Sequence, residues 1–314
     1  MKFDVVCFGA LNMDKLYRVN RIAREDEHSF ITDFVEAAGG SAANTAVGLA
    51  RLELGVGYIG KVASDREGRF LLDDFRKEKV DITGITVARE GISGVVFGFI
   101  DKKGSRALYV APGVNDSLVF EEISLEYACN SKFLHLTSFV GEKPFDAQKR
   151  LLKMVSGVRI SFDPSELYAR RGLSSIRPFL ERSYVVSPNE NELKLLTGKD
   201  HREGSKILLK EGAHIVAVKL GKKGCYVTDD KESHLIEPYK VKVVDTTGAG
   251  DAFCAGFLYG LIKGKDLYEC GRLGNFVASR CITKIGARDG LPKLIDLKNV
   301  SARMSRLHAS KMST

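Results

Sequence analysis

The chain contains 314 residues, of which 44% are hydrophobic and 28% are charged. These are the proportions of an ordinary soluble protein, and no apolar run approaches the roughly 20 residues that a membrane-spanning helix needs. Its 48 Lys and Arg residues outnumber its 40 Asp and Glu residues and give a net charge of +8, but both signs are spread along the whole chain. We therefore expect a solvated basic surface, and neither a membrane nor a nucleic acid as a partner.

The N-terminal residues and the cysteines favour the cytoplasm. Residues 1–14 lead directly into an apolar strand, without the longer apolar core and cleavage site of a secretory signal. The six cysteines are scattered and include no C-x-x-C pair. Reduced and mostly buried thiols are therefore expected, rather than disulfides or a metal site.

Short β-branched runs alternate along the chain with segments of helical periodicity. The runs that we expect to form buried strands are FDVVCFG, VGYIGKV, KFLHL, VRISFD, SYVVS and AHIVAVKL. Helices are expected near 41–54, 65–79, 145–156, 189–197, 203–211, 249–263 and 266–284. The last residues, 309–314, are expected to form a loose tail. This alternation predicts an α/β fold in one domain over residues 1–314, with helices on the faces of a mainly parallel sheet.

Two stretches interrupt this alternation, residues 13–37 and residues 86–112. The second includes GVVFGFIDKKGSRALYVAPG, which predicts a hairpin turning at Lys103 and Gly104. We expect the two stretches to form a small β-lid that stands off the main sheet and excludes water from an active site. The exposed edge strands of such a lid favour a homodimer that pairs through it.

Polar residues and glycines follow the first predicted strand and the first part of the lid. Asn12 and Asp14 lie where a parallel sheet places its binding crevice, and Asp14 is suited either to hold two sugar hydroxyls or to stabilise a turn. Gly39 and Gly40 precede a helix of small residues, which allows close ligand approach or simply tight packing. Asn44, in the first turn of that helix, offers both a donor and an acceptor to a substrate hydroxyl.

Amide and acidic side chains open the helix that follows SYVVS. They include Asn189 and Glu192. Acids in this position complement the helix dipole, which is the default interpretation. If phosphates bind nearby, the same pair can organise Mg²⁺ through its water shell.

The segment VKVVDTTGAGDAFCAGFLYGLIKG carries the strongest chemical signal. We expect a strand at 241–244, a glycine-rich turn and then a helix. Gly248 and Gly250 let successive N–H groups point at one anion, at the positive end of the helix dipole. Asp251 is placed to take a proton from a hydroxyl that attacks a phosphate. Taken alone, the segment is explained at least as well by an acid that stabilises a helix N-terminus.

Two of these segments together resemble the signature segments of the ribokinase, or PfkB, family of carbohydrate kinases. They are residues 39–55 and DTTGAGDAFCAGF at 245–257, and the resemblance covers nearly the whole chain. SPNENELKLLTG resembles the family's Asn-x-x-Glu segment, and VKLGKKGCYV at 218–227 resembles the strand-turn-strand that lines its nucleotide. The resemblance implies a ribokinase-like three-layer α/β/α fold, with a mainly parallel central sheet and a small β-lid.

The resemblance also implies transfer of a phosphoryl group from ATP to a hydroxyl of a small sugar. Asp251 would be the catalytic base, and the backbone of Gly248, Ala249 and Gly250 would bind the transferring phosphate. The residues implied to bind the acceptor are Asn12, Asp14, Gly39, Gly40, Asn44 and Asn115.

Further residues are implied to hold the donor, ATP with Mg²⁺. Glu192 would position the metal, and the nucleotide would lie along Asn189, Lys219, Gly221 and Gly224. Many ribokinases also bind a monovalent cation near the second signature. Asp245, Thr247 and the loop at Gly286 match that site, whereas Gly290 replaces a side-chain ligand.

The sequence leaves the acceptor open. Ribokinases usually have Lys after the paired glycines, but this chain has Ser41, and GGSAANTAVG is closer to archaeal-type nucleoside kinases of the same family. GSRALYVAPGVNDSL instead resembles the lid segment of ribokinases. A kinase of a pentose or similar furanose is the leading hypothesis and a nucleoside kinase the second. A non-catalytic sugar-binding regulator is the alternative from another class.

Overall fold

The computed structural model describes residues 1–297, and the tail expected at 309–314 lies outside them. Within residues 1–297, no helix combines the length and the apolar character needed to cross a membrane. All six cysteines lie in the described part, as free thiols, and five of them are buried.

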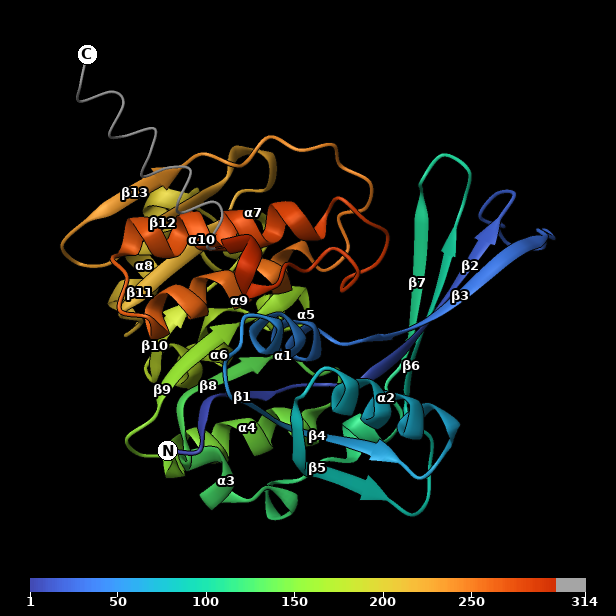
Figure 1. Cartoon of the computed structure of the whole chain (residues 1–314), viewed down its shortest axis with the longest axis horizontal. Helices are drawn as coiled ribbons and strands as arrows, with labels where there is room; N and C mark the ends of the chain where they lie inside the picture. Colours follow the sequence, from blue (N-terminus) through green and yellow to red (C-terminus); the bar gives the residue numbers. More distant parts are fainter. Residues whose placement is uncertain (298–314) are drawn as a thin grey trace.

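A nine-stranded sheet forms the centre of the molecule (Figure 1). Its order is β13-β12-β11-β10-β9-β8-β1-β4-β5, and only the pairs β11–β12 and β12–β13 are antiparallel. The strands are β1 (Phe3–Phe8), β4 (Val56–Ala63), β5 (Asp81–Ala88), β8 (Ser131–Thr137), β9 (Arg159–Asp163), β10 (Ser183–Val186), β11 (Ile215–Lys219), β12 (Cys225–Thr228) and β13 (Ser233–Ile236). The chain continues from β1 outward to both edges, so a crevice is expected beyond the carboxyl end of β1.

Helices cover both faces of this sheet and give the expected three layers (Figure 1). The first face packs against α1 (Ser41–Arg51), α2 (Arg66–Lys77), α9 (Ala249–Ile262) and α10 (Leu267–Cys281). The second packs against α3 (Leu125–Cys129), α4 (Glu142–Met154), α5 (Ser165–Ala169), α6 (Leu173–Leu180), α7 (Glu190–Thr197) and α8 (His201–Lys210). Val5 and Cys7 of β1 point into the first core, whereas Val6 and Phe8 point into the second. Both faces are buried, which explains why the strands lack polar alternation.

A separate four-stranded sheet stands beside the main body (Figure 1). Its order is β3-β2-β6-β7, with β2 (Asn12–Val19), β3 (Ile31–Gly39), β6 (Gly94–Ile100) and β7 (Arg106–Ala111). The pairs β2–β3 and β6–β7 are antiparallel, and β2 joins the two hairpins by pairing in parallel with β6. This sheet is the β-lid expected from the sequence, although residues 86–88 belong to β5 of the main sheet.

The prediction of a strand at 241–244 is wrong. These residues form an extended loop without strand pairing, held by a hydrogen bond from Val244 N–H to Ile282 O at 2.8 Å. Val243 and Val244 are 54% and 51% exposed. Their β-branched side chains therefore lie at the surface, where strand propensity has no buried face to satisfy.

Candidate active site

Asp251 lies in the first turn of α9, at the meeting point of α9 and α1. Ser41 Oγ donates to Asp251 Oδ1 at 2.5 Å, and Asn44 Nδ2 donates to Asp251 Oδ2 at 2.8 Å. Ser41 and Asn44 are both in the first turn of α1, so residues more than 200 positions apart meet at one carboxylate. Both carboxylate oxygens are thereby held in fixed directions.

The Asp251 carboxyl is set to titrate close to neutral pH. Burial raises its pKa from 3.8 to about 6, against the hydrogen bonds from Ser41 and Asn44, which favour the charged form. The negative charge of Asp163 raises the pKa further and Lys219 lowers it. A carboxylate with this pKa is ionised at pH 7 and basic enough to accept a proton from a hydroxyl in a transition state.

The glycine-rich turn before Asp251 leaves backbone donors free. Gly248 caps α9 with φ of 74°, and a Cβ there would lie 2.5 Å from Ala287 Cβ, so only glycine fits. The N–H groups of Gly250 and Asp251 have no acceptor among residues 1–297. Free donors at a helix N-terminus, at the positive end of its dipole, are able to bind an anion. Of the three residues predicted to do so, Ala249 donates its N–H to Thr246 O at 3.2 Å instead, and the anion site stays a prediction.

A buried ion pair lies beside this turn. Lys219 Nζ, at the end of β11, is 2.6 Å from Asp163 Oδ2, at the end of β9. It is also 3.4 Å from the position that a Cβ on Gly250 would occupy. The ammonium group is therefore held close to the anion site by a carboxylate that is 4% exposed. An anion bound to the turn would be attracted by the positive charge of Lys219.

Asn189 and Glu192 form a capping box at the start of α7. Asn189 Oδ1 accepts from Glu192 N–H at 2.8 Å, and Glu192 Oε2 accepts from Asn189 N–H at 2.7 Å. Burial raises the Glu192 pKa from 4.5 to about 7, with Lys219 opposing the shift. The default interpretation from the sequence, a helix cap, thus describes the contacts of both residues.

A large cavity joins these groups. Its volume is about 650 Å³, and it is lined by Ser41, Asp163, Asn189, Glu192, Lys219, Gly221, Gly224, Ala249, Gly250 and Asp251, together with residues of the loop from Pro238 to Thr246. The predicted donor-binding residues thus line the same space as Asp251. A Cβ on Gly224, whose φ is 88°, would collide with Ile236 O, which explains the glycine at this position.

Most residues expected to hold the acceptor lie in the lid or directly after it, but Asn44 lies in α1, where its amide is bonded to Asp251 and Arg288. Asn12 pairs with Gly39 and Asp14 with Ala37 in the β2–β3 ladder. A Cβ on Gly39 would collide with the Asp14 carboxylate, and one on Gly40 would collide with Ala10 O. Burial raises the Asp14 pKa from 3.8 to about 6. The positive charge of Arg288 opposes this increase, and the negative charge of Asp251 adds to it.

Asn115 is tied to the backbone that carries Asn12. Its Oδ1 accepts from Leu11 N–H at 3.0 Å, and its Nδ2 donates to Leu11 O at 2.8 Å and to Asn12 Oδ1 at 3.1 Å. The side chain is 1% exposed. These contacts make Asn115 a support for Asn12, and direct contact with an acceptor stays a prediction.

The loop that resembles a monovalent-cation site is internally bonded. Asp245 Oδ1 accepts from Thr247 N–H and Oγ1 at 3.0 and 2.8 Å, and its Oδ2 accepts from Gly286 N–H at 2.9 Å. Arg106 of the lid reaches the same loop, with Nη1 at 3.4 Å from Thr247 Oγ1. The contact joins the lid to the turn that carries the anion site.

Residues 2–294 match the family described as pfkB family carbohydrate kinase. The chain belongs to this family. It is 47% identical to an uncharacterized sugar kinase of Archaeoglobus fulgidus over 80% of this chain and all of that protein. It is 32% identical to an ATP-dependent ribose-1-phosphate kinase of Halopiger xanaduensis over 90% of this chain and 93% of that protein. The Arabidopsis thaliana ribokinase complexed with ribose and ATP superimposes with a TM-score of 0.85, at 26% identity, over 95% and 98% of the two chains.

Three further residues of this carbohydrate kinase touch the site and were missed as site residues by sequence reasoning. Ser41 was noted only as a departure from ribokinases, Asp163 only as the end of a strand, and Arg288 not at all. Asp163 ends a buried parallel strand, the position that drew attention to Asn12, so the same rule could have found it. Arg288 lies in an irregular loop whose sequence carries no comparable signal.

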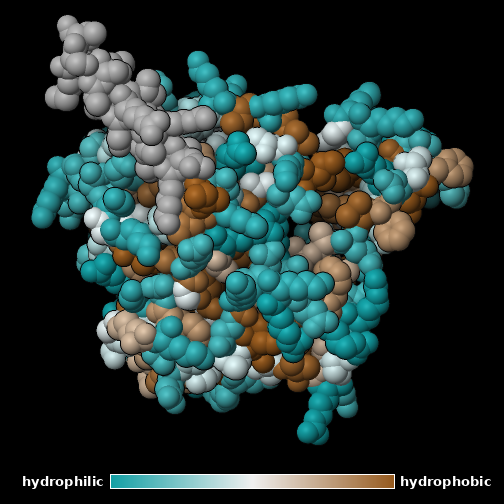
Figure 2. Space-filling view, viewed as in Figure 1, coloured by the Kyte–Doolittle hydropathy of each residue, from teal (hydrophilic) through white to brown (hydrophobic). Residues whose placement is uncertain are grey.

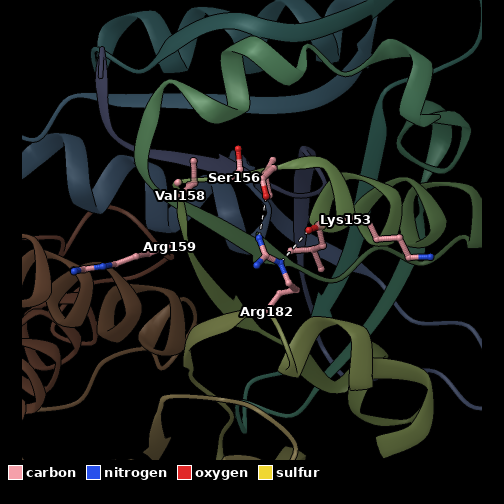
Figure 3. A pocket seen from close by; sticks show the side chains of 8 residues that line it. Lys153, Ser156, Val158, Arg159 and Arg182 are labelled. Carbon is pink, nitrogen blue, oxygen red and sulfur yellow. Dashed lines mark hydrogen bonds between the residues drawn. The ribbon is translucent and has the colours of Figure 1, made fainter.

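A second hollow of the kinase lies beneath the other end of the sheet (Figure 3). Its cations are Lys153, Arg159 and Arg182. Arg182 donates to Leu152 O, in the last turn of α4, at 3.1 Å and to Val155 O, directly after this helix, at 2.9 Å (Figure 3). The guanidinium of Arg159 lies over the Tyr184 ring, 4.6 Å from its centroid. These contacts give both arginines a structural role.

Proposed function

We propose that this carbohydrate kinase transfers the terminal phosphoryl group of ATP to a hydroxyl of a pentose or a similar furanose. The observation that carries the proposal is the Asp251 carboxylate, held by Ser41 and Asn44 beside free N–H groups at the start of α9. A base next to an anion site is what phosphoryl transfer to a hydroxyl requires. The names of relatives that act on ribose 1-phosphate or bind ribose and ATP support the acceptor class.

Each group at the site has a distinct part in this mechanism. The acceptor hydroxyl displaces Ser41 from Asp251 and gives up its proton to the carboxylate as its oxygen attacks the terminal phosphorus. The N–H groups of Gly250 and Asp251 hold the oxygens of the transferring phosphoryl group, whose bond to the leaving diphosphate breaks. Lys219, held near Gly250 by Asp163, offsets the negative charge of the transferring group.

The residues at the start of α7 fit a Mg²⁺ ion that is bound together with ATP. Residues 1–297 contain no cluster of three His, Cys, Asp or Glu side chains that would enclose a metal. Mg²⁺ in kinases usually takes one or two carboxylates, substrate phosphates and waters, and the buried Glu192 carboxyl, whose charge burial disfavours, would gain from a nearby cation. Glu192 and Asn189 would hold the hydrated ion. When bound, Mg²⁺ neutralises charge on the phosphates.

Ser41 favours a nucleoside kinase as the second candidate. It stands where ribokinases usually carry Lys, and its short side chain leaves room beside Asp251 that a nucleobase could use. Assays with ribose, ribose 1-phosphate, fructose 6-phosphate, adenosine, inosine and cytidine, each with ATP and Mg²⁺, distinguish the two. Phosphorylation of none of them would contradict both proposals.

The variant Asp251→Asn tests the assigned chemistry. We expect turnover to fall by at least ~10², because the amide cannot accept the proton, while ATP binding stays close to wild type. The melting temperature should not fall, because the substitution removes a negative charge that burial makes unfavourable in the folded state. Equal turnover in the variant would refute the role of Asp251. Sugar binding without turnover in the wild-type protein would instead favour a non-catalytic regulator.

We also propose that the kinase is cytoplasmic and pairs with a second copy through its lid. Six free cysteines suit a reducing compartment. The lid carries exposed apolar side chains, among them Val35, Leu108 and Val110, and Figure 2 shows hydrophobic residues gathered over the lid strands. Contiguous apolar surface of this kind favours a protein partner.

A further inference from the structure

A chain of hydrogen bonds runs from helix α2 to the catalytic carboxylate. Arg288, in the loop after α10, donates Nε–H to Asn44 Oδ1 at 2.8 Å and pairs through Nη1 with Asp74 of α2. Asn44 Nδ2 in turn donates to Asp251 Oδ2 at 2.8 Å. Arg288 is 8% exposed and Asn44 is 6% exposed. The contacts therefore lie largely out of water, where hydrogen bonds are stronger and misdirected groups cost more.

Arg288 determines which end of the Asn44 amide faces the base. The two ends of an asparagine amide have nearly the same shape, but one donates and the other accepts. A guanidinium has donors only, so Arg288 can bond Asn44 only through Oδ1. That bond leaves Nδ2 toward Asp251. If the amide turned over, Oδ1 would face the carboxylate, and two acceptors would repel each other.

The backbone of Arg288 is held by a hydrogen bond, whereas one nitrogen of its guanidinium lacks a partner among residues 1–297. Arg51 donates from Nη1 to Arg288 O, and Arg51 is itself paired with Glu78 through two hydrogen bonds. Nη2 of Arg288 is buried and has no partner among residues 1–297. An unpaired buried donor costs about 1–3 kcal/mol, so stability alone does not account for this residue.

We propose that Arg288 is a positioning residue for phosphoryl transfer, which fixes the Asn44 amide and through it the carboxylate of Asp251. The proposal rests on the proposed function, because it assigns Arg288 to the same base. Arg288 contacts the side of Asn44 that faces away from Asp251, and it does not line the cavity of the predicted donor site. Its charge also lowers the pKa of Asp14, so a test has to separate this direct effect from the one through Asn44.

A double-mutant cycle tests this path. Arg288→Gln and Asn44→Ala should each lower kcat about 10-fold or more, with a smaller change in the KM for ATP. Adding Arg288→Gln to Asn44→Ala should cause no further loss, because the amide that Arg288 orients is absent. Losses that multiply in the double variant would overturn the proposal, since Arg288 would then act by long-range charge or by general stability.

Two further variants separate positioning from folding. Arg288→Lys keeps a positive charge beside Asp74 but lacks the planar pair of donors, and it should lower kcat nearly as much as Arg288→Gln. Arg182→Gln removes an arginine that also bonds two oxygens, at the other end of the sheet, and should leave kcat unchanged (Figure 3). Wild-type kcat in a folded Arg288→Lys protein would contradict the need for the guanidinium.

A readout without turnover separates this proposal from the proposed function. The pKa of Asp251, followed by carbon NMR of its labelled carboxyl, should rise in Arg288→Gln, because the freed amide no longer stabilises the charged form. The increase should largely vanish when Asn44 is already Ala. Other groups that act on Asp251, namely Ser41, Asp14, Asp163, Glu192 and Lys219, are the same in all four proteins. An equal increase in both backgrounds would overturn the proposal even if no acceptor were phosphorylated.

Discussion

Asp251 gives the kinase a pH dependence that an ordinary carboxyl would not give. The raised pKa, about 6, means that the carboxylate is present above pH 6 and is lost as the pH falls through it. We expect kcat/KM to decline on the acidic side with a midpoint near pH 6. Ser41→Ala removes a hydrogen bond to the charged form, so its midpoint should move to higher pH. The pH profiles of both proteins check this, and a midpoint near 4 in the wild type would contradict it.

Individual site residues differ in how far the sequence reveals them. Asp251 follows a glycine-rich turn and Asp14 follows the first predicted strand. In both cases the position in the sequence is enough to indicate a binding or catalytic residue. Asp163 and Arg288 act through partners 56 and 244 positions away, Lys219 and Asn44. Such pairs depend on how strands and loops are ordered in space, and no local spacing in the chain encodes that order.

At the scale of elements, helix α7 begins with a capping box whose residues we have also proposed to hold Mg²⁺. Glu192→Gln keeps one oxygen for the N–H of Asn189 but removes the negative charge. We expect the Mg²⁺ concentration for half-maximal activity to rise about 10-fold, because a carboxylate near the hydrated ion is lost. Titration of activity with Mg²⁺ at fixed ATP measures this.

Two substitutions of Asn189 test the capping role of the same helix start. Serine caps a helix nearly as well as asparagine, so thermal stability should stay close to wild type, whereas Asn189→Ala should lose about 1 kcal/mol. An unchanged Mg²⁺ requirement in Glu192→Gln, with normal stability, would leave the pair with a capping role only.

The elements were predictable where a buried face imposes a period on the sequence. The six strands and seven helices expected from such patterns are all present. The prediction of a strand at 241–244 failed because a β-branched run forms a strand only if a neighbouring strand can pair with it. Val241 and Val243 line a cavity instead, and Val244 is exposed. The helices α3, α5 and α6 were not predicted. The five residues of α3 and of α5 are too few to display a helical period, and α6 contains Pro178, a residue that disfavours a helix interior.

At the scale of the whole molecule, one face of the lid carries a row of apolar side chains. Val35, Leu16, Gly98 and Leu108 lie side by side across β3, β2, β6 and β7, and Val110 lies on the same face beside Val96. Leu16 and Leu108 meet over Gly98, where a Cβ would lie 2.6 Å from Leu16 Cδ2. This face also bears Asp14, yet Val35, Leu108 and Val110 remain 50–51% exposed. The acceptor region therefore uses only part of the face.

In the proposed dimer, the second copy would cover the remaining part of this face with the same apolar row and with two further unpaired edge strands. In light scattering, we expect the wild-type protein to have twice its chain mass of 34.5 kDa. The double variant Val35→Asp, Leu108→Asp should have the mass of a single chain. Leu235→Asp, which replaces an equally exposed leucine on β13 at the far edge of the main sheet, should leave the dimer intact. The new carboxylates are exposed in the single chain and would be buried without a partner only in the dimer. Their desolvation therefore weakens association and not folding. A single-chain mass for the wild type, or a dimer that survives both lid substitutions, would contradict pairing through this face.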